Sequence, residues 1–156
     1  MTANAEAPEP VLDTSRLTHL VGYAASRASL ELRKTFLKHV GPLQLKVVEF
    51  SLLVLVASNP RMNQKQLGAA LGLSAPNLAV ILDKLAERGL VERVRSTLDR
   101  RAQQLHLTPA GRSLTARAEA IAATMEEDAL RMLSGAERAL LIELLMKVAR
   151  GRPVRR

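Results

Sequence analysis

The sequence predicts a mainly α protein, an α+β winged helix-turn-helix with six helices and a two-stranded β-hairpin. Apolar residues recur at helical spacing over most of the chain, which is typical of helices packed on a core. Only 2% of the residues are aromatic, so the core must be built from Leu, Ala, Val and Ile. Two short segments, Leu90-Val91 and the alternating Gln104–Leu107, bracket an arginine-rich stretch and predict the hairpin.

The first two helices are separated by a break at Gly41-Pro42. The helix before this break is expected over roughly Ser15–Val40, with Asp13 or Thr14 as its cap. The helix after it, Leu43–Ser58, is almost wholly apolar, so we expect it at the centre of the core.

The third and fourth helices form the helix-turn-helix itself. Asn63 and Gln66 make a capping box at the start of the third helix, and Gly72-Leu73 turns the chain. Ser74 is expected to cap the fourth helix, and Gly89 stands where a left-handed residue commonly ends one.

Two further helices follow the hairpin. Thr108-Pro109 starts a fifth helix that is expected to reach about Leu133. Ser134 and Glu137 form a second capping box, which opens a sixth helix that reaches about Arg150.

The charge of the chain points to a polyanionic partner. The formal net charge is +8 and the isoelectric point is about 10.8, which favours nucleic acid. An acidic membrane surface would also attract this charge, but no segment reaches the ~18 uninterrupted apolar residues of a spanning helix. The N-terminus has neither the basic nor the apolar region of a signal peptide, so we expect a cytoplasmic protein.

Several chemistries are excluded by the residues present. The chain has no cysteine, which excludes disulfides, thiolate metal sites and cysteine catalysis. The histidines, His19, His39 and His106, are scattered, and no metalloprotease, serine hydrolase or phosphate-loop motif occurs. We therefore expect neither an enzyme nor a bound metal or cofactor.

The fourth helix has one apolar face and one polar face. The apolar stripe is expected to pack inward and consists of Leu78, Ile81, Leu82 and Leu85. On the other face, Asn77 can bind adenine through both a donor and an acceptor, and Val80 can meet a thymine methyl. Ser74 and Lys84 are candidates for holding phosphates. The alternative is that these positions are only solvated.

Five arginines lie between the end of the fourth helix and the last strand: Arg88, Arg93, Arg95, Arg100 and Arg101. Arginine on a thin loop can enter the narrow minor groove, where the potential is most negative. Arg95, Arg100 and Arg101 are the candidate DNA contacts of this wing. Asp99 is expected to fix the shape of the hairpin by pairing with one of its arginines. The alternative is a charged surface hairpin that binds nothing.

The order of these motifs resembles the MarR (multiple antibiotic resistance regulator) family. The run Leu73–Leu78, continued by Leu82–Arg93, resembles the recognition-helix segment of that family. Leu98–Ala102 and Leu105–Arg112 are similar to its wing and to the start of the helix that follows. The helix order over residues 15–150 fits as well, so the resemblance covers nearly the whole chain.

The resemblance implies a homodimeric repressor that binds double-stranded DNA and releases it when a small, often aromatic, ligand binds. Ala75 and Val80 depart from the pattern, since many relatives have polar or basic residues there. Specificity is then expected to depend more on Asn77, the wing and DNA shape. The alternative function is an architectural DNA-binding protein without a small-molecule effector.

The terminal helices carry more apolar residues than a small domain can bury alone: Leu12, Leu17, Leu20, Leu130, Leu133, Leu140, Leu141, Leu144, Leu145 and Val148. We expect them to form the dimer interface that the family resemblance implies, with half-sites about 10 base pairs apart. The alternative is that the sixth helix packs internally. The expected division is a flexible arm (1–12), dimerisation helices (13–42 and 109–150), a DNA-binding lobe (43–108) and a basic tail (151–156).

A polar stripe on the first helix is the candidate effector site. His19, Tyr23 and Arg27 follow one another at four-residue spacing, Arg16 lies one turn before them, and His39 lies near the helix end. Arginine could pair with a carboxylate or phenolate, and tyrosine or histidine could donate hydrogen bonds. A phenolic acid and its coenzyme A thioester suit this stripe equally well. The alternative is a polar face of the dimer surface.

Overall fold

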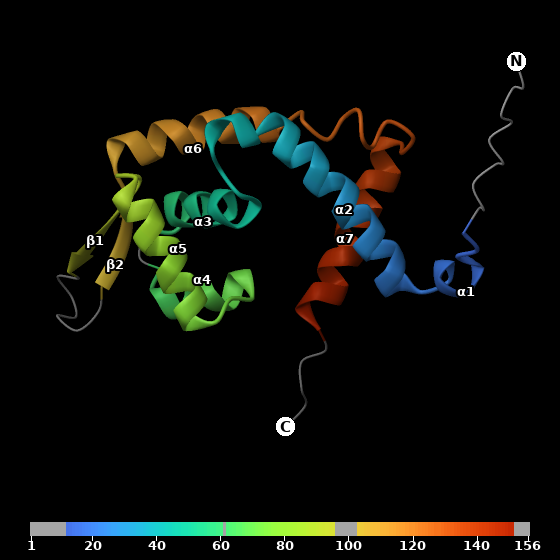
Figure 1. Cartoon of the computed structure of the whole chain (residues 1–156), viewed down its shortest axis with the longest axis horizontal. Helices are drawn as coiled ribbons and strands as arrows, with labels where there is room; N and C mark the ends of the chain where they lie inside the picture. Colours follow the sequence, from blue (N-terminus) through green and yellow to red (C-terminus); the bar gives the residue numbers. More distant parts are fainter. Residues whose placement is uncertain (1–11, 61, 96–102, 152–156) are drawn as a thin grey trace, which may run out of the picture.

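The computed structural model describes residues 12–60, 62–95 and 103–151. It confirms the mainly helical winged helix-turn-helix (Figure 1). The elements are α1 (Ser15–Thr18), α2 (Val21–His39), the 3-10 helix η1 (Gly41–Leu43), α3 (Val47–Ser58), α4 (Gln64–Leu71), α5 (Ala75–Glu87), β1 (Val91–Arg95), β2 (Gln103–Leu107), α6 (Pro109–Ala122) and α7 (Gly135–Arg150).

Figure 1 shows two parts, one of helices packed with a β-hairpin and one made of helices alone. The helices α3, α4 and α5 pack with the hairpin β1–β2 into one lobe, and α6 runs along its edge from the hairpin towards α2. The helices α1, α2 and α7 lie at the other end of the molecule. The lobe therefore contains the whole helix-turn-helix and both strands of the hairpin, as the motif order predicts.

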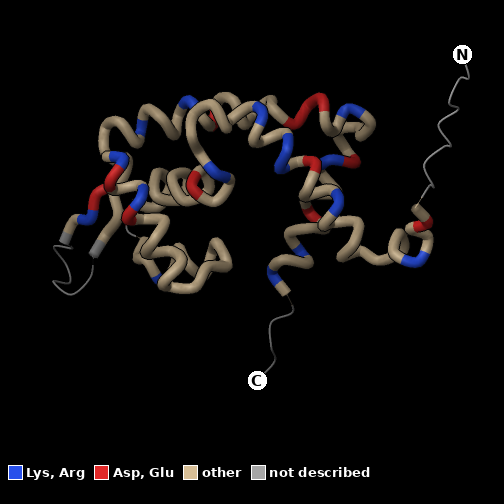
Figure 2. Tube along the Cα trace, in the orientation of Figure 1, with Lys and Arg blue, Asp and Glu red and all other residues tan. Residues whose placement is uncertain are grey.

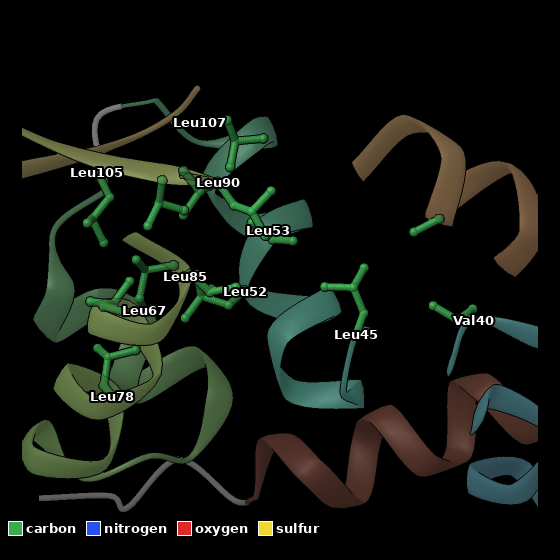
Figure 3. Packing of buried hydrophobic residues seen from close by; sticks show 14 of the residues in the cluster. Val40, Leu45, Leu52, Leu53, Leu67, Leu78, Leu85, Leu90, Leu105 and Leu107 are labelled. Carbon is green, nitrogen blue, oxygen red and sulfur yellow. The ribbon is translucent and has the colours of Figure 1, made fainter. Parts of the chain in front are cut away.

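The core of the lobe is built almost entirely from leucine. Figure 3 shows the leucines of α3, α4, α5 and the hairpin converging on one another: Leu52, Leu53, Leu67, Leu78, Leu85, Leu90, Leu105 and Leu107. Each is at most 6% exposed, and full burial of such a side chain contributes about 1.5–3 kcal/mol to folding. Leu78, Leu82 and Leu85 are buried and Ile81 is half-buried, which confirms the predicted apolar stripe of the fourth helix.

The hairpin is antiparallel, with Val91 opposite Leu107 and Arg93 opposite Leu105. Residues opposite one another in an antiparallel pair share a face of the sheet, and alternate residues of a strand share it too. Val91, Leu105 and Leu107 are buried, so this face covers the core. Arg93 therefore lies on the face that turns towards the helices.

Both predicted capping boxes are present. The Asn63 side chain accepts from the Gln66 N–H at 2.9 Å, and the Gln66 side chain accepts from the Asn63 N–H at 3.0 Å. Ser134 and Glu137 make the same reciprocal pair, and the hydrogen bonds from Ser134 hold the pKa of the Glu137 carboxyl below its usual value. Ser74 is in the N-cap position of α5, but its side chain makes no capping hydrogen bond, contrary to prediction.

The predicted first helix is not continuous. It is divided into α1 and α2 by a break at His19 and Leu20, and Leu20 has an extended backbone. No residue of α1 is buried, and Gly22, a poor helix former, follows the break. Neither packing nor local propensity therefore favours one helix through this point.

The second helix also begins later than predicted. Gly41–Leu43 forms η1, and α3 starts only at Val47. Between them, Gln44 has a φ of 55°, in the left-handed region that a residue with a side chain seldom adopts. This turn sets the direction in which the chain passes from α2 into the lobe.

The predicted fifth helix ends early, at Ala122 instead of Leu133. Residues 123–133 form successive turns, although they contain no glycine or proline. The guanidinium of Arg138, from α7, donates to the carbonyl oxygens of Glu127 and Leu130 at 3.3 and 3.0 Å. These carbonyls are bound by a side chain distant in sequence, so helix propensity alone does not decide the local structure.

Candidate nucleic-acid interface

The turn between α4 and α5 depends on two glycines. The chain bends by 107° between these helices, within the range typical of a helix-turn-helix. Gly72 ends α4 with a φ of 63°, which glycine adopts without strain. A Cβ on Gly68 would lie 3.1 Å from the Leu73 carbonyl oxygen, so this glycine lets the turn approach α4 closely.

The DNA contacts predicted for the fourth helix lie on the exposed side of α5. Ser74, Ala75, Asn77, Val80 and Lys84 are all exposed, and the Val80 side chain is 53% exposed although it is apolar. The buried leucines of α5 hold the opposite side against the core. The structure thus brings these five residues to one surface, beginning at the helix N-terminus. Their individual roles stay predictions.

A hollow of about 230 Å³ lies beside this surface, between the first turns of α4 and α5. Its lining consists of Gln64, Lys65, Gly68, Leu73, Ala75 and Leu78. Gln64 and Lys65 were not among the residues selected from the sequence. Their position at the start of the first helix of the motif was the available signal, because that helix crosses the DNA backbone in helix-turn-helix proteins.

The helix α5 ends in a Schellman motif. The Leu90 N–H donates to the Leu85 carbonyl at 2.9 Å, and the Gly89 N–H donates to the Ala86 carbonyl at 2.8 Å. Gly89 has a φ of 66°, as its predicted position after the helix requires. The Gly89 carbonyl also accepts from the Thr108 hydroxyl at 2.6 Å, which joins the end of α5 to the start of α6.

Two of the five arginines that the sequence assigns to the wing region are paired within the lobe. Arg93 Nη2 lies 2.6 Å from Asp83 Oδ1, and Arg88 Nη1 lies 3.7 Å from Glu49 Oε2. Figure 2 shows acidic as well as basic residues around β1 and the end of α5. Sequence reasoning missed both pairs. The strand alternation that places Arg93 on the face of Val91 was a usable signal for the first pair.

The wing tip lies outside the described residues. Arg95 ends β1, where its backbone pairs with Gln103. Asp99, Arg100 and Arg101 belong to residues 96–102, so their predicted roles stay predictions.

The candidate effector residues are not brought together as one stripe. Tyr23 and Arg27 lie one turn apart on α2, whereas His19 precedes the helix and Arg16 belongs to α1. His39 is the last residue of α2, about four turns from Tyr23. Tyr23 is half-buried, and the other four are exposed. The break at Leu20 corrects the predicted continuous stripe, and effector binding by these residues stays a prediction.

The described residues offer neither a metal centre nor a membrane-spanning helix. No group of three or more metal-ligating side chains is found there. No single described helix is long and apolar enough to cross a membrane. The α4–α5 pair reaches the length and apolarity only when its two sharply bent helices are taken together.

Comparison with known proteins agrees with the architecture. Residues 43–102 match the model of the MarR family. A protein of Thauera aromatica, described as a regulator of transcription of the hcr operon, is 35% identical over 101 residues. That match covers 65% of this chain and 61% of the relative, so the chain spans less than two thirds of the relative's length.

Two solved structures are similar over nearly the whole chain. The transcriptional repressor CouR bound to a 23-mer DNA duplex is 40% identical with a TM-score of 0.83, over 90% of this chain and 99% of that one. CouR bound to p-coumaroyl-CoA is 37% identical with a TM-score of 0.82, over 91% of this chain and 100% of that one. Together with the helix-turn-helix and the hairpin, these similarities show that the chain belongs to the MarR family of transcriptional regulators.

Proposed function

We propose that the protein is a homodimeric transcriptional repressor that binds a pseudo-palindromic DNA site and leaves it when an aromatic, anionic effector binds. The observation that supports this most is the similarity to CouR, whose structures hold a DNA duplex in one case and p-coumaroyl-CoA in the other. The exposed face of α5 and the net charge of +8 supply what duplex binding needs.

In this proposal, Asn77 and Val80 meet base edges, and Ser74, Ala75 and Lys84 lie against the DNA backbone or the groove edge. Arg95, Arg100 and Arg101 form the cationic wing. Residues 43–108 act as the DNA-binding lobe, and residues 13–42 and 109–150 act in dimerisation.

The exposed apolar surface of α7 supports a homodimer. No residue of α7 is buried, and all but Arg138 are exposed, including Ile142 at 63% and Val148 at 69%. Leu17 and Leu20, at the start of the chain, are also exposed. A monomer seldom leaves so many large apolar side chains in water, so a second copy of the chain is the natural cover. Leu144→Glu should convert the dimer to a monomer in light scattering and should weaken DNA binding.

The effector is proposed to be a phenolic acid or its coenzyme A thioester. The support is the p-coumaroyl-CoA held by the similar repressor, together with the cations and the tyrosine of α1 and α2. Arg27 would pair with an anionic group, and Tyr23 would donate a hydrogen bond.

A binding experiment tests the proposal in two steps. A random-sequence duplex library first identifies the sequence that the protein prefers. Addition of p-coumaroyl-CoA, p-coumarate or free coenzyme A to the complex then tests release. Release by the thioester or the acid, with no effect of free coenzyme A, is expected. A preferred sequence that no ligand releases would favour an architectural DNA-binding protein, and no preference for any sequence would contradict the repressor itself.

A further inference from the structure

We propose that Glu49 is a positioning residue for sequence-specific DNA binding. Through Arg88, it fixes the C-terminal end of α5, the proposed recognition helix, against the start of α3. This inference rests on the proposed function. It assigns a role to a buried carboxylate that lies outside the exposed face of α5.

Glu49 is the buried acidic residue among the described residues of the lobe, with 7% of its surface exposed. Its Oε2 accepts a hydrogen bond from the Lys46 N–H at 2.9 Å and lies 3.7 Å from Arg88 Nη1. A buried carboxylate is costly unless it is paired and hydrogen-bonded, and here both conditions are met by groups from two different helices. The same oxygen therefore joins the start of α3 to the end of α5.

The helix dipoles favour this junction. Glu49 lies in the first turn of α3, where the N–H groups carry partial positive charge, and Arg88 caps the end of α5, where the carbonyls carry partial negative charge. Each side chain thus has the sign that its own helix end prefers, and the two charges also attract one another. The attraction between the two charges is lost if the two helix ends separate.

Arg88 lies where a small movement of the backbone would shift both the exposed face of α5 and the wing. It precedes Gly89, the left-handed residue of the Schellman motif, and the first wing strand begins only three residues after Arg88. The buried leucines hold the body of α5, but the Glu49–Arg88 pair lies at its end. Loss of the pair should let the end of α5 and the wing move relative to α3. This movement should weaken binding to the selected DNA sequence more than binding to random DNA.

The two partners give a test that separates position from charge. Glu49→Gln raises the net charge by one and Arg88→Gln lowers it by one. If only long-range attraction to DNA mattered, the first would tighten binding and the second would weaken it. If the pair positions α5, both variants should weaken binding to the selected duplex by about tenfold, which corresponds to ~1.4 kcal/mol. Binding to a scrambled duplex should stay within about twofold of the charge-matched control.

Glu31→Gln is the control for Glu49→Gln, because it removes the same charge from an exposed i, i+3 pair with Lys34 on α2. The double variant Glu49→Gln/Arg88→Gln should bind no more weakly than either single variant. The proposal is overturned if the losses of affinity multiply in the double variant, or if binding to scrambled DNA weakens equally. Tighter binding of the selected duplex by Glu49→Gln would also overturn it. Should Glu49→Gln fail to fold, Arg88→Gln compared on the two duplexes decides alone. A wild-type protein that selects no sequence would instead overturn the proposed function, and this inference with it.

Discussion

The Arg93 guanidinium lies 2.6 Å from the Asp83 carboxylate, so the first wing strand is joined directly to the recognition helix. The side chains are 35% and 56% exposed, and water therefore screens the pair. Such a pair contributes at most about 1 kcal/mol to folding. The pair adds a direct link between the first hairpin strand and α5 to the buried contacts of Val91 and Leu105.

Replacement of Asp83 by Asn should therefore lower DNA selectivity with little loss of stability. We expect the ratio of affinities for selected and random duplexes to fall, while the free energy of unfolding changes by less than about 1 kcal/mol. Glu87→Gln, which removes an exposed carboxylate from the same helix, is the control for the change in charge. An equal fall in selectivity in both variants would contradict a positioning role for the Asp83–Arg93 pair.

Gly111 should tolerate no side chain. A Cβ at this position would lie 1.9 Å from the Leu90 carbonyl oxygen, which belongs to the backbone and cannot rotate away. Gly111→Ala should lower the free energy of unfolding by about 1–3 kcal/mol or more, measured by urea denaturation. Gly22→Ala is the matched control, because nothing lies within 4 Å of a Cβ there. A similar stability of the two variants would show that the α6–hairpin junction relaxes easily.

Asn77→Ala should cost about 1–3 kcal/mol of binding free energy at one base pair of each half-site. The measurement compares the variant on the selected duplex and on duplexes changed at single positions. Lys84→Ala should instead weaken binding to all sequences alike, because a phosphate contact carries no sequence information. If Asn77→Ala behaves like Lys84→Ala, then Asn77 holds only the backbone.

Arg100→Ala and Arg101→Ala should weaken binding broadly and flatten its salt dependence. Each phosphate contact that is lost should reduce the slope of log K against log salt by about 0.9. Arg117→Ala, which removes an exposed cation of α6 that is not among the proposed DNA contacts, controls for the loss of one positive charge. An unchanged slope in both wing variants would argue against the assignment of residues 96–102 to a DNA-binding wing.

Local patterns predicted the helix starts well. The Asn63–Gln66 and Ser134–Glu137 boxes form between residues three apart, so the sequence itself contains every group involved. Ser74 was predicted by the same reasoning, but its hydroxyl makes no capping bond. The apolar stripe of α5 was predictable because one periodicity fixes which side chains face the core.

Long-range contacts limited the prediction of the site. Arg88 and Arg93 look like wing cations in the sequence, and only folding brings Glu49 and Asp83 to them. The hollow lined by Lys65 likewise exists only when α4 and α5 pack together, although the place of Lys65 at the start of α4 could be read from the sequence.

The sequence by itself determined the fold class, the order of helix, turn, helix and hairpin, and the polar face of α5, because these depend on spacing along the chain. The tertiary structure alone decided where the predicted fifth helix ends, which arginines are paired, and how α5 is held at its end. Those features depend on side chains such as Arg138 and Glu49 meeting groups far away in sequence, and periodicity carries no information about such meetings.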